Sequence, residues 1–256
     1  MMKPAVLLKA LGAGIIVIFT ASSASAATIN LTGTIRDFND THPDFEKELG
    51  TDKGIVQSTL GADGKPVYAG QAGNPTTHGQ AAFDQWYRDV PSVNLSKPYT
   101  ITLDEIGNSG LYTYSNKSFF PIDGQLLGNQ GNSHNYHFTY ELASKFTYKG
   151  GETFKFSGDD DLWVFLNKKL AIDLGGVHQT EEQSVNLDTL GLTPGETYDF
   201  NLFFAERHTT ESNFSITTSI ALESSAVPEP LTLGGTALAG ALGWWMKRKQ
   251  QASRTA

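Results

Sequence analysis

The chain has 256 residues, among them 19 Lys and Arg, 27 Asp and Glu, and no cysteine. Residues 27–228 hold 13 of the basic and 26 of the acidic residues, which gives that part a net charge of −13. A body this acidic repels phosphate backbones, so the composition argues against nucleic-acid binding. The lack of cysteine excludes a disulfide scaffold, a thiol nucleophile and cysteine-ligated zinc.

Residues 1–26 are predicted to be a secretory signal peptide. Lys3 and Lys9 supply positive charge, an apolar run over 11–19 follows, and Ala24-Ser25-Ala26 matches the small-residue pattern of a cleavage site. The mature chain would then begin at Ala27. Residues 27–223 are long enough to form one β domain with its own core.

The middle of the chain shows the period-two alternation of half-buried strands. The alternation is clearest over 136–142, 153–157, 198–204 and 214–222, whereas 162–166 is apolar on both faces and is predicted to be a central strand. One short helix is expected over 80–89. Together these patterns predict an all-β fold, an antiparallel β-sandwich.

The C-terminal residues divide into three parts. Residues 224–230 form a linker that contains Pro228, Glu229 and Pro230, 231–246 are apolar or small, and 247–256 begin with a basic cluster. The apolar part can nearly cross a bilayer as a helix, and the basic cluster predicts a cytoplasmic tail. The three parts in this order also resemble the PEP-CTERM sorting signal. That resemblance implies a Gram-negative envelope and processing by an exosortase-type enzyme; a plain membrane anchor is the alternative.

Three consecutive aspartates, Asp159, Asp160 and Asp161, stand between two strongly hydrophobic predicted strands. Their mutual repulsion is costly unless a cation neutralises it, and calcium accepts carboxylate and carbonyl oxygens. Neighbouring side chains of a regular strand point to opposite faces, so two of them reach one ion only in a turn or across an unusual peptide bond. A solvated acidic turn is the alternative.

Six blocks of the sequence form a further pattern: Phe119-Phe120-Pro121-Ile122-Asp123-Gly124, His134-Asn135-Tyr136-His137-Phe138-Thr139, 158–167, 173–178, 204–207 and 212–214. Together they resemble the fibro-slime domain, which is similar to the fourteen-kilodalton domain of bacterial protective antigen and to the flocculin lectins. The resemblance implies a jelly-roll β-sandwich whose sugar-binding members hold calcium with an Asp-Asp pair joined by a cis peptide. A later loop adds an Asn and backbone carbonyls, and the ion ligates sugar hydroxyls.

Carried over by position, the resemblance implies that Asp159 and Asp160 are the pair and that Asn213 is the loop Asn, with Glu206 second. Asp161 stands where the family commonly has Gly, so the pair Asp160-Asp161 remains open.

Three further residues are candidate ligand or loop contacts. Arg207 could pair with a carboxylate or a sugar hydroxyl, and a structural salt bridge is favoured. His178 could order the loop near the acidic site. Trp86 could stack on a sugar ring, and a place in the core is favoured.

The sequence therefore predicts a non-enzymatic protein that binds calcium and carbohydrate, adhesin- or lectin-like, at the cell surface or in an exopolysaccharide or biofilm matrix. It would be anchored transiently in the inner membrane by its C-terminal helix. One alternative is a structural matrix protein in which calcium only stabilises loops. An enzyme acting on polysaccharide is a further alternative, although the chain has none of the motifs G-x-S-x-G, H-E-x-x-H or the P-loop.

Overall fold

The computed structural model describes residues 27–46, 49–70 and 75–224. The predicted signal peptide, the Pro-Glu-Pro motif, the apolar stretch 231–246 and the basic tail all lie outside these residues. Within them, no helix combines the length and the apolar character needed to span a lipid bilayer.

The described residues form mostly strands, and the all-β prediction is confirmed. The strands are β1 (Thr28–Phe38), β2 (Gly50–Thr51), β3 (Asn94–Glu105), β4 (Tyr112–Asn116), β5 (Phe138–Thr147), β6 (Thr153–Asp159), β7 (Asp161–Leu166), β8 (Lys169–Leu174), β9 (Gly176–Val177), β10 (Glu181–Asn186), β11 (Thr197–Glu206) and β12 (Asn213–Thr218). The helical turns are α1 (Gln80–Phe83) and the 3-10 turn η1 (Leu187–Leu190). Strands β5, β6, β7, β11 and β12 fall on the five segments singled out in the sequence.

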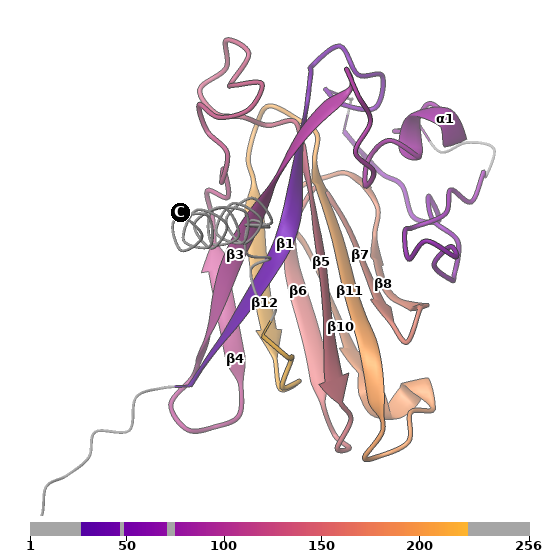
Figure 1. Ribbon diagram of the computed structural model, residues 1–256, viewed down its shortest axis with the longest axis vertical. Helices are drawn as coiled ribbons and strands as arrows, with labels where there is room; N and C mark the ends of the chain where they lie inside the picture. The colour runs from indigo at the N-terminus through magenta and orange to yellow at the C-terminus, as the bar shows by residue number, and fades with distance from the viewer. Residues whose placement is uncertain (1–26, 47–48, 71–74, 225–256) are drawn as a thin grey trace, which may run out of the picture.

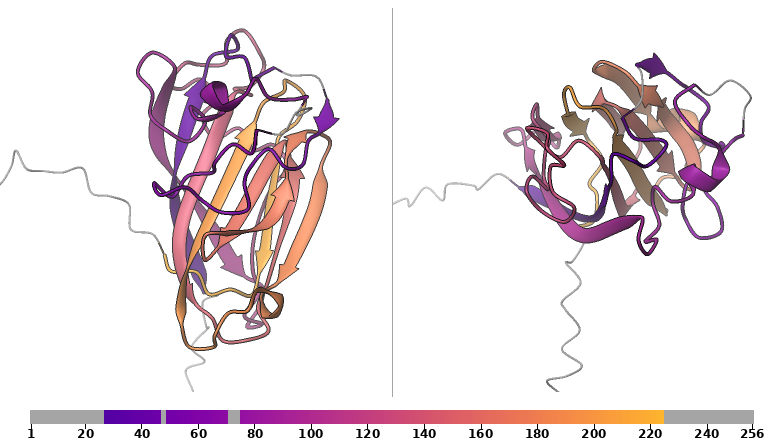
Figure 2. Two further views of the ribbon diagram at one scale, coloured as in Figure 1. Left: turned by 90° about the vertical axis from the view of Figure 1, so that its right-hand side faces the viewer. Right: turned by 90° about the horizontal axis from the view of Figure 1, so that it is seen from above.

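Ten strands form one antiparallel sheet in the order β10-β6-β12-β4-β3-β1-β5-β11-β7-β8. The sheet curls until its two ends meet, so that its halves face each other like the layers of a sandwich (Figures 1 and 2). At the meeting point the Asp173 backbone N–H of β8 donates to Gln183 Oε1 of β10 at 3.2 Å. The outer side of β8 is covered by segment 55–60, where Thr59 forms a β-bridge with Lys169.

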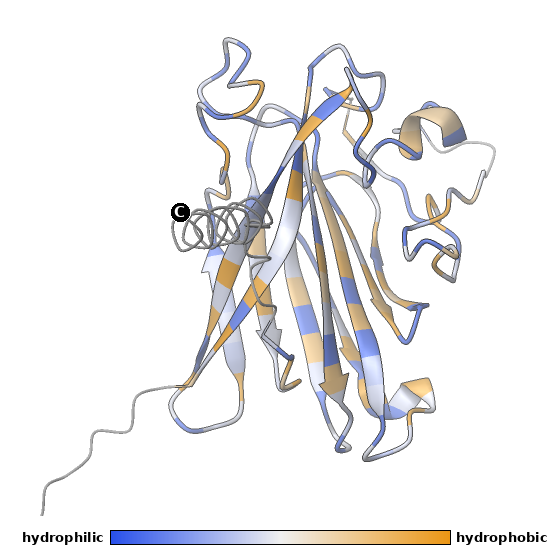
Figure 3. Ribbon diagram, viewed as in Figure 1, coloured by the Kyte–Doolittle hydropathy of each residue, from blue (hydrophilic) through white to orange (hydrophobic). Residues whose placement is uncertain are grey.

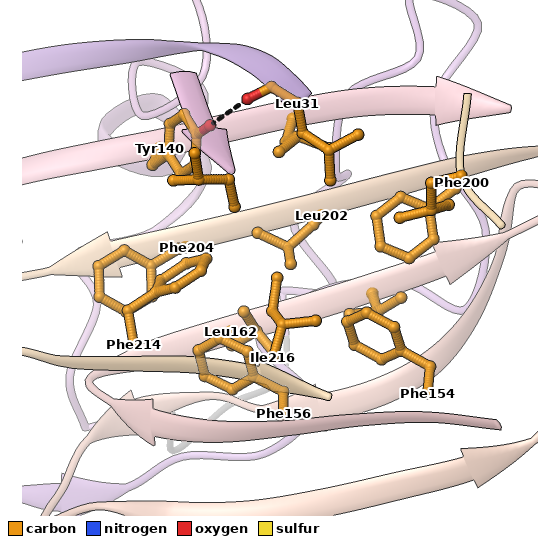
Figure 4. Packing of buried hydrophobic residues seen from close by; sticks show 14 of the residues in the cluster. Leu31, Tyr140, Phe154, Phe156, Leu162, Phe200, Leu202, Phe204, Phe214 and Ile216 are labelled. Carbon is orange, nitrogen blue, oxygen red and sulfur yellow. Dashed lines mark hydrogen bonds between the residues drawn. The ribbon is translucent and has the colours of Figure 1, made fainter. Parts of the chain in front are cut away.

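The main core fills the space inside the curled sheet. Along the strands apolar residues alternate with polar ones (Figure 3), and the apolar set points inward. Phe154 and Phe156 of β6, Phe200 and Phe204 of β11, and Phe214 of β12 pack there at ring-centroid distances of 5.0–6.4 Å (Figure 4). Much of the aromatic content of the sequence therefore lies in this interior.

Strand β7 is buried on both faces, as its apolar sequence predicted. Leu162, Val164 and Leu166 face the main core. Trp163 and Phe165 face outward into a second hydrophobic cluster, to which residues within 38–45, 55–68 and 83–93 contribute the cover over the sheet. This cover is what allows six consecutive residues of one strand to be inaccessible to solvent.

The expected helix over 80–89 is only one turn long, so that prediction is wrong beyond Phe83. Asn94 donates its Nδ2 to the carbonyl oxygens of Gln85 (3.1 Å) and Arg88 (2.9 Å). These side-chain hydrogen bonds satisfy backbone groups that would otherwise continue a helical ladder. The turns that result direct Trp86 and Tyr87 into the second cluster.

Candidate functional site

Four chain segments meet at one end of the sheet and form the candidate site. Strand β6 ends at Asp159 and β7 begins at Asp161, while β11 ends at Glu206 and β12 begins at Asn213. Register places Asn213 opposite Asp159, and Ala205 opposite Asp161. The antiparallel sheet therefore brings together residues that lie up to 54 positions apart in the sequence.

The peptide bond between Asp159 and Asp160 is cis. The expectation of an unusual peptide bond in the acidic run is confirmed. Both side chains line one cavity of about 420 Å³, with His178, Thr180 and other loop residues around it. The two carboxyl groups are thus available to a single ligand.

Asp159 accepts three hydrogen bonds. Its Oδ1 accepts from the Asn213 backbone N–H at 2.7 Å, and its Oδ2 accepts from Asn213 Nδ2 and Thr180 Oγ1, each at 2.8 Å. Thr180 was not foreseen, because nothing in its sequence surroundings marks a hydroxyl 21 positions away as a partner of the acidic run.

Asp160 lies deeper, with 5% of its surface exposed. Its Oδ2 accepts from the Arg207 backbone N–H at 3.0 Å. Burial raises the pKa of Asp160 well above its ordinary value; Arg207 opposes this rise, and the neighbouring carboxylates of Asp161 and Asp159 add to it.

Asp161 is engaged in a buried salt bridge with Arg207. Its Oδ2 accepts from Arg207 Nε at 2.6 Å and its Oδ1 from the Gly176 N–H at 2.6 Å, and both side chains are fully buried. Arg207 also donates to the carbonyl oxygens of Asp44 (3.1 Å) and Thr76 (2.5 Å). The salt-bridge interpretation of Arg207 is confirmed.

Trp86 belongs to the core. Its ring lies under the Arg207 guanidinium, 4.6 Å from ring centroid to Cζ, and its Nε1 donates to Asp44 Oδ2 at 3.0 Å. The indole is fully buried and does not line the cavity, so stacking of Trp86 on a sugar is wrong in this structure.

His178 lines the cavity, and its ring nitrogens face the carbonyl oxygens of Gln179 (2.8 Å) and Leu174 (3.3 Å). Leu174 is the last residue of β8 and Gln179 follows His178 directly, so the ring ties the loop beside the acidic site to the end of β8. This agrees with the expected role of His178 in ordering the loop.

Glu206 is the most unusual member of the group. Its side chain is completely buried, and in the described part of the chain neither carboxyl oxygen accepts a hydrogen bond. Burial raises the pKa of Glu206 well above its ordinary value, and the charge of Asp160 raises it further. The Ser212 hydroxyl and the His208 N–H lie near the carboxyl group and oppose this rise, although neither forms a hydrogen bond of ordinary geometry with it.

The donor atoms suit a hard divalent cation. Four carboxyl groups, those of Asp159, Asp160, Asp161 and Glu206, share one fully buried guanidinium among the described side chains around them, that of Arg207. The carboxyl groups in excess of this guanidinium must either be protonated or have their charge balanced by a cation. Carboxylate oxygens and the Asn213 amide oxygen are ligands that calcium accepts, and a half-turn of that amide would present Oδ1 in place of Nδ2.

As it stands, the site is not pre-arranged around an ion. Among the described residues, no three His, Cys, Asp or Glu side chains are grouped as ligands of one metal. The residues offer oxygen atoms of the kind that calcium accepts and an excess of carboxyl groups, but in the described part of the chain they are not grouped around one position.

Residues 107–231 match the family model of the PA14 domain. The matched range includes β6 and β7, which meet at the acidic run, and β11 and β12, which flank the loop before Asn213. The protective-antigen part of the resemblance is thereby supported, while its fibro-slime type stays a prediction.

Curated relatives are found in Dictyostelium discoideum. Protein psiR is 43% identical over 225 residues, which cover 81% of this chain and 23% of psiR. Protein psiD is 42% identical over 222 residues, which cover 80% of this chain and 44% of psiD. The chain thus spans less than half the length of each.

Two solved structures are similar at a low level. The PA14 domain of the MpAFP antifreeze protein is 10% identical with a TM-score of 0.37, over 82% of this chain and 99% of that one. A PA14 sugar-binding domain from an RTX adhesin is 11% identical with a TM-score of 0.35, over 77% of this chain and 94% of that one.

Proposed function

We propose that this chain is a carbohydrate-binding, adhesin-like protein whose ligand site is the cavity at the junction of β6 and β7, and that binding depends on calcium. The observation that carries the proposal is the pair Asp159 and Asp160, both lining one cavity beside an excess of buried carboxyl groups. The family match over this region supports it.

In this proposal Asp159, Asp160 and Asn213 hold the ion. Calcium would offer its remaining coordination positions to sugar hydroxyls. Asp161 would position Arg207 rather than bind the ion, because its two oxygens already accept hydrogen bonds from Gly176 and Arg207. Arg207 in turn fixes Asp160 through its backbone N–H. Glu206 is buried close to Asp160 and is the candidate for a further ligand.

A binding role is favoured over a catalytic one. The carboxyl groups that line the cavity are adjacent in the sequence, whereas a glycosidase needs two carboxyl groups on opposite sides of the scissile bond. Glu206, the more distant carboxyl group, does not line the cavity.

The proposed setting is the cell surface or an extracellular polysaccharide or biofilm matrix, reached by export and exosortase-type processing. The support for it lies in residues 1–26 and 224–256, of which the structure describes only Ser224. Mass spectrometry of the exported protein tests it: a chain that begins at Ala27 and ends near Glu229 is expected, and one that keeps residues 1–26 would contradict it.

A glycan array probed with the purified protein, in millimolar calcium and in EDTA, tests the function. Selective binding that disappears in EDTA is the expected result. Sugar binding that survives EDTA would overturn the calcium dependence. Absence of sugar binding together with a calcium-dependent melting temperature would favour a structural matrix protein, in which calcium only stabilises loops.

A further inference from the structure

A second hollow adjoins the candidate site on the outer face of the sheet. It has a volume of about 240 Å³ and lies over β4, β12 and β6, with Thr180 and Glu182 at one side. Thr180 lines both hollows, and Asn213 lines the second one while it holds Asp159. The two hollows are therefore neighbours that meet at Thr180.

The register of the strands creates this hollow. Ser115, Ser215 and Ser157 stand directly opposite one another on β4, β12 and β6. Their neighbours along the strands, such as Phe214 and Phe156, are buried in the core, so the serines point outward. Because these three neighbouring side chains are small, the surface is hollowed at this point, and the serines form the floor of the hollow.

Larger polar side chains form the rims. Lys155 pairs with Glu182 at 2.9 Å on one side, and Lys117 lies on the other. The hydroxyl groups of Ser115, Ser157 and Thr217 make no hydrogen bond to any part of the chain that the structure describes. A concave surface with unengaged hydroxyl groups on its floor and the Lys117 ammonium at its rim suits a neutral ligand rich in hydroxyls.

We propose that this hollow binds the sugar residue next to the one held at Asp159 and Asp160, so that the ligand is an extended glycan chain. The inference rests on the proposed function, because it needs a first sugar in the adjoining cavity. The groove then recognises linked residues through the hydroxyl groups on its floor, and a single sugar uses only part of the surface.

Calorimetric titration with linear mannose, glucose and galactose oligomers of one to four residues, in calcium, tests this. In the series that binds, affinity should rise about tenfold from the monosaccharide to the disaccharide or trisaccharide, equivalent to one or two net hydrogen bonds. An affinity that does not change with chain length would overturn the groove while leaving the calcium site intact.

The variant Ser215→Phe fills the floor of the groove from an outward-facing strand position. It should return the oligomer affinity to that of the monosaccharide and leave the monosaccharide affinity unchanged. Thr217→Phe blocks the same groove further along β12 and serves if Ser215→Phe does not fold. Asn201→Phe, outward on β11 beside a different hollow, is the matched control and should bind like the wild type.

Equal losses for monosaccharide and oligomer in Ser215→Phe would mean that the residue acts on the first site, and would overturn the groove. If nothing on the glycan array and no oligomer in the three series binds in calcium, the proposed function and this inference both fail. Where the array identifies another sugar, its oligomers replace the three series. Monosaccharide binding that EDTA abolishes, with no gain from longer chains, would refute the groove alone.

Discussion

Asp160 is the residue through which a cation should have its largest effect on the fold. An ion that binds only the folded protein stabilises it by about 2.7 kcal/mol at a concentration one hundred times its Kd. Asp160→Ala should remove most of the calcium-dependent rise in melting temperature. Asp123→Ala should keep it, because Asp123 bonds His134 (2.7 Å) in the 117–137 loop and does not line the cavity.

Scanning calorimetry in EDTA and in millimolar calcium measures both variants. Equal losses of the calcium effect in the two variants would show that the ion binds elsewhere. An unchanged melting temperature of the wild type between the two buffers would argue against any calcium site.

Asp37 is a buried carboxyl group remote from the acidic run. Burial raises its pKa to about 6, although Asn135 Nδ2 and the Leu127 N–H donate to it at 3.0 and 2.7 Å. A raised pKa means that the folded state favours the protonated form. The contribution of Asp37 to stability is therefore complete below its unfolded pKa near 3.8 and is lost as the pH rises through about 6.

The loss amounts to about 3 kcal/mol, at about 1.4 kcal/mol for each pKa unit. The stability of the wild type relative to Asp37→Asn should fall by that amount between about pH 3.5 and 7, as measured by urea denaturation. Asp188 is an internal reference for an NMR titration, because the hydroxyl of Tyr148 and the N–H of Gly151 lower its pKa. Titration of Asp37 near its unfolded pKa of 3.8 would contradict the prediction.

At the scale of elements, the Asp161–Arg207 pair connects strands β7 and β11 to the segment that covers them. Arg207 reaches Asp44 and Thr76, which lie 163 and 131 positions away in the sequence. Asp161→Ala would leave the guanidinium buried and without its carboxylate, and removal of one partner of a buried pair costs about 3–5 kcal/mol.

Urea denaturation in EDTA measures this cost without any contribution from calcium. Asp199→Ala is the matched control, because it breaks the exposed pair with Lys145 (2.6 Å), and such pairs contribute at most about 1 kcal/mol. If the two variants lose the same small amount, the buried pair does not hold the covering segment in place.

The elements that could be predicted were those in which alternation was uninterrupted. Strands β1 and β3 are the longest of the described strands, yet neither has a clean pattern, because Gly33 interrupts one and Pro98 the other. Only glycine fits at position 33, because a Cβ there would lie 2.2 Å from the Glu141 carbonyl oxygen of β5. Such a requirement is invisible until the strands are paired.

The acidic pair and its cis peptide bond could be predicted, because three adjacent carboxyl groups repel one another unless a cation neutralises them and because the resemblance supplied the geometry. The different hydrogen-bond partners of Asp160 and Asp161 could not be predicted. They depend on Arg207, which approaches from β11 and takes one carboxylate with its side chain and the other with its backbone. Nor could the sequence reveal that Glu206 lacks a hydrogen-bond partner among the described residues.

At the scale of the whole molecule, the contact between β8 and β10 and the cover over β8 affect how copies of the protein can associate. A strand edge with free N–H and C=O groups is a template on which another copy can add a strand. Here the two terminal strands of the sheet are turned toward each other, and Thr59 occupies the outer side of β8. An approaching copy therefore meets an edge of β8 that is already occupied at Lys169, which disfavours the joining of two sheets into a fibre.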